Sequence, residues 1–168
     1  MERWDAYDRD GTPAGLDLIR GEPIPKGLYH LVSGVLVRHT DGDYLLMQRD
    51  PGKPNFPGYY EATAGGSALK GEDALACAKR ELYEETGIAA GTFTEIDRRT
   101  YEDGRIFYSF LCRTGWDKTA IRLQEGETVA FCWVGEKEFA DFIRSERAIP
   151  AQMERYQGYF LWMGYRKA

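Results

Sequence analysis

The pattern of apolar and polar positions predicts a chain built mainly of strands. Strands are expected at residues 4–7, 16–20, 28–38, 44–48, 59–64, 92–101, 105–113 and 128–134. The stretch 28–38 is β-branched and apolar, which is typical of a buried strand, and Asp41-Gly42 predicts a hairpin turn after it. Residues 21–27 and 51–58 are rich in Gly and Pro, so both are expected to be loops.

One segment, residues 73–86, has a clear helical pattern. Acidic residues open it, where they favour the positive end of the helix dipole, and Gly87 follows it as a natural C-terminal glycine. Leu75, Ala78 and Leu82 are expected to form its apolar stripe. Further helices are expected at 137–144 and 152–160. Strands around one central helix, with more helix towards the end, predict an α/β (α+β) fold with a central mixed sheet sandwiched by helices.

Length and charge limit the possible domain organisation and the possible partners of the protein. The 168 residues contain no repeat or linker, so we expect a single domain over residues 1–168, with residues 1–27 as an N-terminal strand and loop extension. The net charge of -5, without any Lys/Arg block, disfavours a nucleic-acid polymer as partner. No apolar run reaches membrane-spanning length, and Cys77, Cys112 and Cys132 form no C-x-x-C pair, so a cytoplasmic protein is expected.

Three glutamates of the predicted helix are spaced for joint chemistry. Glu81, Glu84 and Glu85 stand at positions i, i+3 and i+4, which places their carboxylates on one helix face. Like charges at this spacing repel each other unless cations lie among them. Oxygen-preferring ions such as Mg²⁺ or Mn²⁺ meet that demand.

The residues before the helix support the same site. Arg80 can pair with Glu72 across the loop-to-helix junction and so hold the loop against the helix. Gly65 and Gly66 would let the backbone approach a metal ion or a phosphate closely.

This region resembles the Nudix box, G-x5-E-x7-R-E-U-x-E-E-x-G-U, where U is aliphatic. A chance match to its seven strict identities is expected on the order of once in a hundred million starting positions. Every fixed position of the pattern is occupied as required: Gly66, Glu72, Arg80, Glu81, Leu82, Glu84, Glu85, Gly87 and Ile88. The resemblance implies the Nudix α/β/α sandwich, with a loop-helix-loop that gathers divalent cations around a diphosphate.

The same resemblance implies an activity and roles for individual residues. It implies metal-dependent hydrolysis of a diphosphate linkage in a small nucleoside-diphosphate-type substrate, with Mg²⁺ or Mn²⁺ as cofactor. Glu81, Glu84 and Glu85 would be metal ligands, joined by the Gly65 carbonyl, while Glu72 and Arg80 would brace the loop. A carboxylate would accept the proton of the attacking water. That carboxylate belongs either to the box or to Glu127, whose neighbour Glu125 competes for the role.

Substrate contacts outside the box are far less determined by the sequence. Tyr60 could stack on a base, and Arg49 and Arg105 could meet phosphates, although packing or surface roles compete at each position. His30 lies on an apolar strand, which favours a packed core histidine. The aromatic stretch 159–163 could supply contacts of a homodimer or pack on its own domain, and the sequence does not choose between them.

Two other functions are alternatives to the hydrolase. The order of residues before the box is also similar to the branch of the superfamily that contains isopentenyl-diphosphate isomerase. That enzyme uses a cysteine and histidines near the box, whereas residues 60–66 contain neither, so a hydrolase fits better. A catalytically silent nucleotide-binding module on the same fold is the other alternative. The intact box disfavours it.

Overall fold

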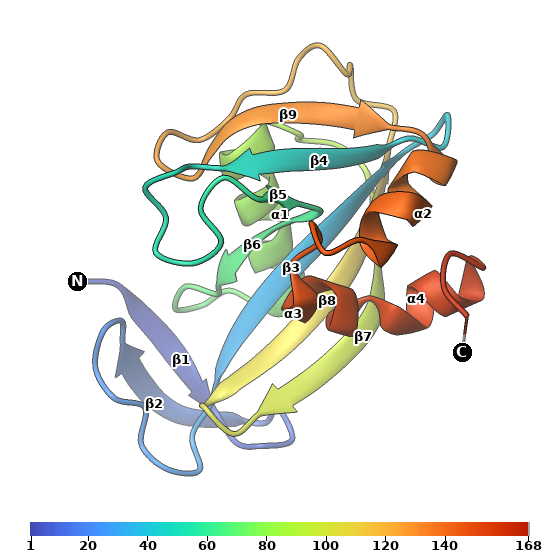
Figure 1. Cartoon of the computed structure of the whole chain (residues 1–168). Coiled ribbons are helices and arrows are strands. Elements are labelled where there is room, and N and C mark those ends of the chain that lie inside the picture. Colours follow the sequence, from blue (N-terminus) through green and yellow to red (C-terminus); the bar gives the residue numbers. More distant parts are fainter. Residues whose placement is uncertain (168) are drawn as a thin grey trace.

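A mixed sheet with helices on both faces forms the body of the molecule (Figure 1). The computed structural model describes residues 1–167. Over these residues the main sheet has seven strands: β3 (His30–His39), β4 (Tyr44–Arg49), β5 (Tyr60–Glu61), β6 (Thr63–Ser67), β7 (Thr92–Tyr101), β8 (Arg105–Thr114) and β9 (Thr128–Val134).

Strand β3 organises this sheet because it pairs on both sides. On one side it runs parallel to β8, whose other edge is paired antiparallel with β7. On the other side it meets β4 only near the hairpin, at Arg38 and Tyr44, and then pairs antiparallel with β6. Strand β4 continues away from β3 and pairs with β5 and β9. The sheet therefore opens between β3 and β4, and β6 enters the opening with Gly65 opposite Gly34.

Four helices of the described chain cover the sheet. Helix α1 (Ala74–Thr86) packs against β3 and β6, and α2 (Glu136–Arg144), α3 (Pro150–Arg155) and α4 (Gln157–Trp162) lie on the opposite side (Figure 1). Successive side chains of β3 point to opposite faces of the sheet and so contribute to the apolar cores on both faces. Val35 and Val37 belong to the apolar cluster under α1, and Leu36 to the cluster under the other helices. The predicted mixed sheet between helices is confirmed.

The core beneath α2–α4 is aromatic. Tyr44 is fully buried, stacks on Phe139 with ring centroids 3.9 Å apart, and shares hydrogen bonds with the hydroxyls of Tyr159 (2.6 Å) and Tyr165 (3.0 Å). The aromatic tail thus packs largely on its own chain. Its Trp162 is the exception, with 81% of the residue exposed.

Three expectations about the elements were wrong in detail. The strand expected at 59–64 is two strands, because β5 pairs with β4 whereas β6 pairs with β3. Between them the Ala62 N–H donates to the Gln152 side chain (3.0 Å). The single helix expected at 152–160 is divided into α3 and α4 at the buried Tyr156. Leu75 does not join the apolar stripe of α1, since it is 38% exposed and Cys77 is buried there instead.

The first 20 residues form a separate hairpin beside the main sheet. Strands β1 (Arg3–Tyr7) and β2 (Pro13–Ile19) pair antiparallel and have a small apolar cluster of their own around Trp4 and Leu18. The Trp4 ring packs on the His30 ring of β3, with centroids 4.0 Å apart. His30 is 5% exposed, which agrees with the expected packed core histidine.

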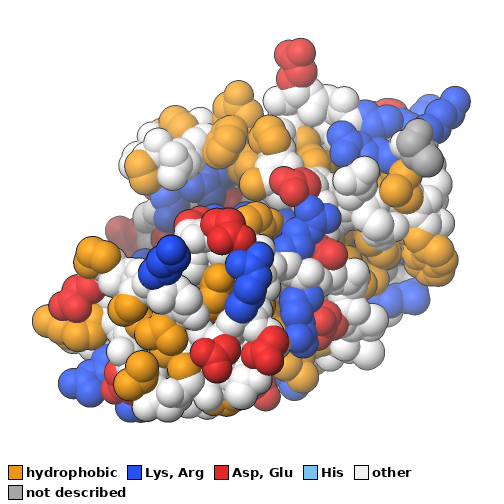
Figure 2. Space-filling model, turned by 90° about the horizontal axis from the view of Figure 1, so that it is seen from below, with side chains coloured by type: hydrophobic (Ala, Val, Ile, Leu, Met, Phe, Trp, Pro, Cys, Tyr) orange, Lys and Arg blue, Asp and Glu red, His pale blue; other side chains and the backbone are white. Residues whose placement is uncertain are grey.

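The surface of the described chain carries charges of both signs. On the face seen in Figure 2, Lys and Arg side chains alternate with Asp and Glu side chains instead of forming one continuous basic stripe. None of the helices within residues 1–167 has the length and apolarity needed to cross a membrane.

Candidate active site

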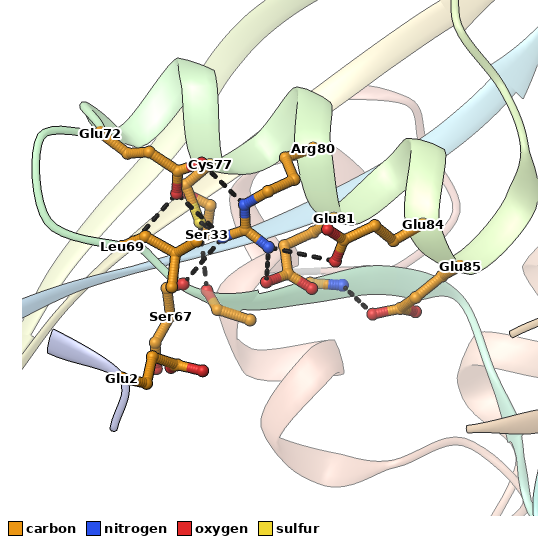
Figure 3. Close-up of polar contacts among 12 residues, drawn as sticks. Glu2, Ser33, Ser67, Leu69, Glu72, Cys77, Arg80, Glu81, Glu84 and Glu85 are labelled. Carbon is orange, nitrogen blue, oxygen red and sulfur yellow. Dashed lines mark hydrogen bonds and ion pairs between the residues drawn. The ribbon is translucent and has the colours of Figure 1, made fainter. Parts of the chain in front are cut away.

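Helix α1 is held at both ends, which fixes the direction of its polar face. The Asp73 carboxylate accepts a hydrogen bond from the Ala76 N–H (2.7 Å) and caps the first turn. Gly87 ends the helix with φ 77°, a left-handed conformation that favours glycine, and its N–H donates to the Tyr83 carbonyl. The face carrying Arg80, Glu81 and Glu84 is thereby directed towards strand β6 and the loop after it (Figure 3).

Arg80 joins this helix to the loop. Its guanidinium donates to both carboxylate oxygens of Glu72, at 2.7 and 2.9 Å, and to the Ser67 carbonyl at 3.0 Å. Glu72 also accepts from the Leu69 N–H (2.9 Å). The hydrogen bonds from Arg80 lower the pKa of Glu72, so the carboxylate stays charged and the loop stays closed on the helix (Figure 3).

The three box glutamates form an acidic wall beside β6. The Arg80 guanidinium reaches Glu81 at 2.7 Å and Glu84 at 3.1 Å, and Glu85 accepts from the Gly65 N–H at 3.0 Å. Burial raises the pKa of Glu81. Burial raises the pKa of Glu85 well above its usual value, and the negative charges of neighbouring glutamates add to this. A cation placed against this wall would relieve both effects.

Two glycines let the wall approach the sheet. A Cβ atom on Gly66 would collide with the Glu81 carboxylate, whose Cδ would lie 2.6 Å away. A Cβ atom on Gly65 would collide with the backbone of β3, where the Gly34 Cα would be 2.9 Å away. The backbone of β3 therefore requires glycine at position 65, whereas a side chain at position 66 would displace the Glu81 carboxylate.

The acidic wall faces a cleft of about 550 Å³, a size usual for small-molecule sites. Arg49, Lys53 and Glu127 also line it, and Lys53 pairs with Glu127. The N-terminal hairpin adds Glu2 and Arg20 to the lining. The cleft is thus polar and carries side chains of both charges.

The other candidate residues are placed differently. Arg49 lines the cleft, but its guanidinium is bound to the buried Glu61 carboxylate (2.9 Å) and to the Asn55 carbonyl (3.1 Å). Tyr60 packs against the core under α2–α4 and does not line the cleft. Arg105 pairs with Asp103 instead and stands outside the cleft. Glu125, the competitor of Glu127, is exposed and also lies outside it.

Four residues at or next to the cleft were not anticipated from the sequence: Glu2, Arg20, Lys53 and Glu61. Glu61 is buried and holds Arg49 and Gln152, and the other three line the cleft. Nothing in their local patterns distinguishes them from surface charges, because the hairpin and the 51–58 loop reach the cleft only through tertiary packing.

The donor set suits a hard divalent cation. Carboxylates of Glu81, Glu84 and Glu85 share one wall, and the two glycines leave the backbone open beside them. Within residues 1–167 no three acidic, His or Cys side chains are already arranged around one point that a metal ion could fill. Arg80 binds one oxygen each of Glu81 and Glu84, which leaves the second oxygen of each carboxylate to a cation.

Comparison with known proteins identifies the class to which this fold and site belong. The family model described as the NUDIX domain matches residues 28–154, and the chain belongs to the Nudix family. Its enzyme class, a hydrolase acting on pyrophosphate bonds, is confirmed at the level of the family.

Relatives with similar sequences carry the same family name. The Nudix hydrolase lmo0368 of Listeria monocytogenes is 32% identical over 153 residues, which cover 89% of this chain and 89% of the relative. YfcD of Escherichia coli, also named a Nudix hydrolase, is 33% identical over 113 residues, 66% of this chain and 62% of YfcD. The crystal structure of DR0079 from Deinococcus radiodurans is similar in fold, with a TM-score of 0.69, 16% identity, and coverage of 92% of this chain and 99% of DR0079.

Proposed function

We propose that the protein hydrolyses a diphosphate linkage in a small nucleoside-diphosphate-type substrate, with Mg²⁺ or Mn²⁺ as cofactor. The observation that carries this proposal is that the wall of Glu81, Glu84 and Glu85 and the cationic side chains of Arg20, Arg49 and Lys53 line one cleft. Metal ions held by carboxylates, together with basic side chains, are suited to bind a diphosphate. The cleft offers both arrangements in a volume suited to a nucleotide.

The roles proposed for the box residues follow from their positions. Glu81, Glu84 and Glu85 would hold the cations, together with the Gly65 carbonyl. When bound, such ions neutralise the diphosphate and lower the pKa of a water molecule so that hydroxide is available near neutral pH. Arg80 and Glu72 keep the loop against the helix, and Gly66 keeps Glu81 close to the strand.

Besides holding the cations, the protein has to accept one proton during the reaction. As the water oxygen bonds to phosphorus and the anhydride P–O bond breaks, a carboxylate accepts the water's proton. That group is either a box glutamate or Glu127, which lines the cleft next to Lys53. The ion pair with Lys53 would hold the Glu127 carboxylate at the cleft.

A screen of diphosphate compounds tests the proposal. Phosphate or nucleotide release is measured for nucleoside di- and triphosphates, ADP-ribose, other nucleotide sugars and dinucleotide polyphosphates, with and without Mg²⁺ or Mn²⁺. The same assays use Glu84→Gln, and Glu138→Gln on the exposed side of α2 serves as matched control. Metal-dependent turnover that Glu84→Gln abolishes and Glu138→Gln retains supports the hydrolase. Absence of turnover in folded, metal-supplied protein would favour a binding module.

Other parts of the proposal concern the chain as a whole. Residues 1–168 would act as one Nudix unit on a small molecule, without a nucleic-acid polymer or a membrane as partner. Three free cysteines, Cys77, Cys112 and Cys132, suit a cytoplasmic location. A homodimer remains a prediction, and light scattering of the purified protein would test it.

A further inference from the structure

The N-terminal hairpin, outside the matched Nudix domain, is fastened to the loop that carries the box. The Asp5 carboxylate accepts from the Gly71 N–H (2.6 Å), and the Lys70 N–H donates to the Arg3 carbonyl (2.9 Å). The Lys70 ammonium adds an ion pair with Asp17 of β2 (2.6 Å). Both strands of the hairpin are therefore attached to residues 70–71, directly before the helix of the acidic wall.

A short chain of contacts leads from the hairpin core to the cleft. Trp4 is 8% exposed and packs on His30, and its indole N–H donates to the Glu2 carboxylate at 3.0 Å. Glu2 in turn accepts from the Arg20 guanidinium at 3.0 and 3.2 Å, and the Arg20 backbone N–H donates to the Glu2 carbonyl. Figure 3 shows Glu2 beneath Ser67, at the edge of the box loop. Arg20 is thus linked through Glu2 to the buried Trp4.

Arg20 differs in exposure from the other cations that line the cleft. Arg80 is bound to Glu72, Glu81 and Glu84, and its side chain is 22% exposed. Arg49 pairs with the buried Glu61 and Lys53 with Glu127, and their side chains are 18% and 21% exposed. Arg20 pairs with Glu2 and its side chain is 66% exposed. Within the described residues its side-chain hydrogen bonds all use one nitrogen, Nη1. The remaining N–H groups of this guanidinium are available to a ligand.

We propose that Arg20 is a substrate-binding residue that contacts phosphate oxygens, and that Glu2 is its positioning residue. This inference rests on the proposed function, because it concerns the same diphosphate. Metal ions at the acidic wall would cover the oxygens on the helix side. A guanidinium presents N–H donors in a planar fork that matches phosphate, and Arg20 presents them from the hairpin side. The hairpin thereby becomes one wall of the substrate site.

Binding and kinetics together test Arg20. The probe is methylenediphosphonate, a non-hydrolysable diphosphate, titrated with Mg²⁺ into wild type, Arg20→Met and Arg20→Lys by calorimetry. Arg3→Met is the matched control, since Arg3 lies on the same hairpin, pairs with Asp17 and does not line the cleft. We expect Arg20→Met to raise Kd about tenfold, Arg20→Lys to raise it less, and Arg3→Met to leave it within about twofold. With the substrate found by the screen, KM of Arg20→Met should rise by a similar factor to Kd, while its kcat stays within about twofold of wild type.

Each outcome separates this inference from the hydrolase proposal. If Arg20→Met binds the diphosphonate as wild type does, the assignment of Arg20 is wrong even when the enzyme is active. The wild-type protein could bind the diphosphonate without hydrolysing any diphosphate. If Arg20→Met then binds the diphosphonate more weakly than wild type, the hydrolase proposal fails and the binding role of Arg20 stands. Lack of binding to wild type would overturn the role of Arg20.

A double-mutant cycle tests the positioning role of Glu2. Glu2→Ala leaves Arg20 without its carboxylate, so KM is expected to rise about threefold with kcat unchanged. Glu2→Asp should raise KM less than Glu2→Ala does. In the Arg20→Met background, Glu2→Ala should cause no further rise in KM. Equal effects of Glu2→Ala in the presence and absence of Arg20 would contradict the positioning role.

Discussion

Arg80 and Glu72 face each other through two hydrogen bonds of 2.7 and 2.9 Å, from Nε and Nη2 of the arginine to the two oxygens of the carboxylate. Their side chains are only 22% and 19% exposed, so the pair is shielded from water. The third guanidinium nitrogen, Nη1, holds Glu81 and Glu84. One side chain therefore closes the loop and keeps the acidic wall together before a cation binds.

Replacing Arg80 by methionine is expected to destabilise the metal-free protein. Glu72 would keep its largely buried charge without its partner, which should cost about 2 kcal/mol of unfolding free energy. Urea denaturation in the presence of EDTA measures this. Arg3→Met removes a more exposed pair, with side chains 62% and 32% exposed, and should change stability little. Similar losses in both variants would argue against a special role of the Arg80 pair.

Gly66→Ala is expected to damage the site while preserving the fold. The new methyl group would displace the Glu81 carboxylate, so metal-dependent turnover should fall by more than about tenfold. Gly158→Ala, where a Cβ meets nothing within 4 Å, is the control and should retain activity. Circular dichroism monitors the fold of both variants. A fully active Gly66→Ala would show that Glu81 does not need its present position.

Arg49 is expected to matter mainly for stability. Its partner Glu61 is 7% exposed, and burial raises the pKa of this carboxyl although Arg49 opposes the shift. Arg49→Met leaves that acid unpaired and should lower the unfolding free energy by about 3 kcal/mol. Adding Glu61→Leu should restore much of the loss. If the double variant is no more stable than Arg49→Met, the pair is not what makes Arg49 important.

The hairpin contact should give the protein a dependence on acid pH. Burial lowers the pKa of His30 to about 4 from a usual value of 6.5. The unfolded state therefore binds a proton that the folded state resists, and stability falls as the pH drops from 6.5 towards 4. The expected loss from this group is about 3 kcal/mol at pH 4.

His30→Phe isolates that contribution, because phenylalanine keeps a ring beside Trp4 and does not titrate. Urea denaturation at pH 7 and pH 4, followed by tryptophan fluorescence, should show a smaller acid-induced loss in the variant than in wild type. Equal losses in the two proteins would mean that His30 does not resist protonation in the folded state.

The box residues could be predicted as a group because their relationship is local. Glu81, Glu84 and Glu85 lie within two helical turns, so helix geometry alone places them on one side, and Gly87 ends the helix as expected. The mixed sheet followed from periodicity. The division of the expected 59–64 strand could not be predicted in this way, because it follows from pairing with two different strands, β4 and β3. The Gln152 side chain that accepts from the Ala62 N–H between them is 90 residues away in the chain.

The remainder of the cleft depends on tertiary contacts that leave no local pattern. The sequence leaves Arg49 either a phosphate contact or a structural role, and the structure gives it the buried Glu61 as partner. Arg20 is the last residue of the strand expected at 16–20. Only the attachment of the hairpin to residues 70–71 brings it to the site.

The position of Glu2 in the cleft has a practical consequence for handling the protein. Met1 is 97% exposed and directly precedes a residue that lines the site. An affinity tag or fusion partner joined at this end would emerge at the mouth of the cleft and could compete with the ligand there. Ligand affinities are therefore best compared on protein that has been freed of any tag before Met1.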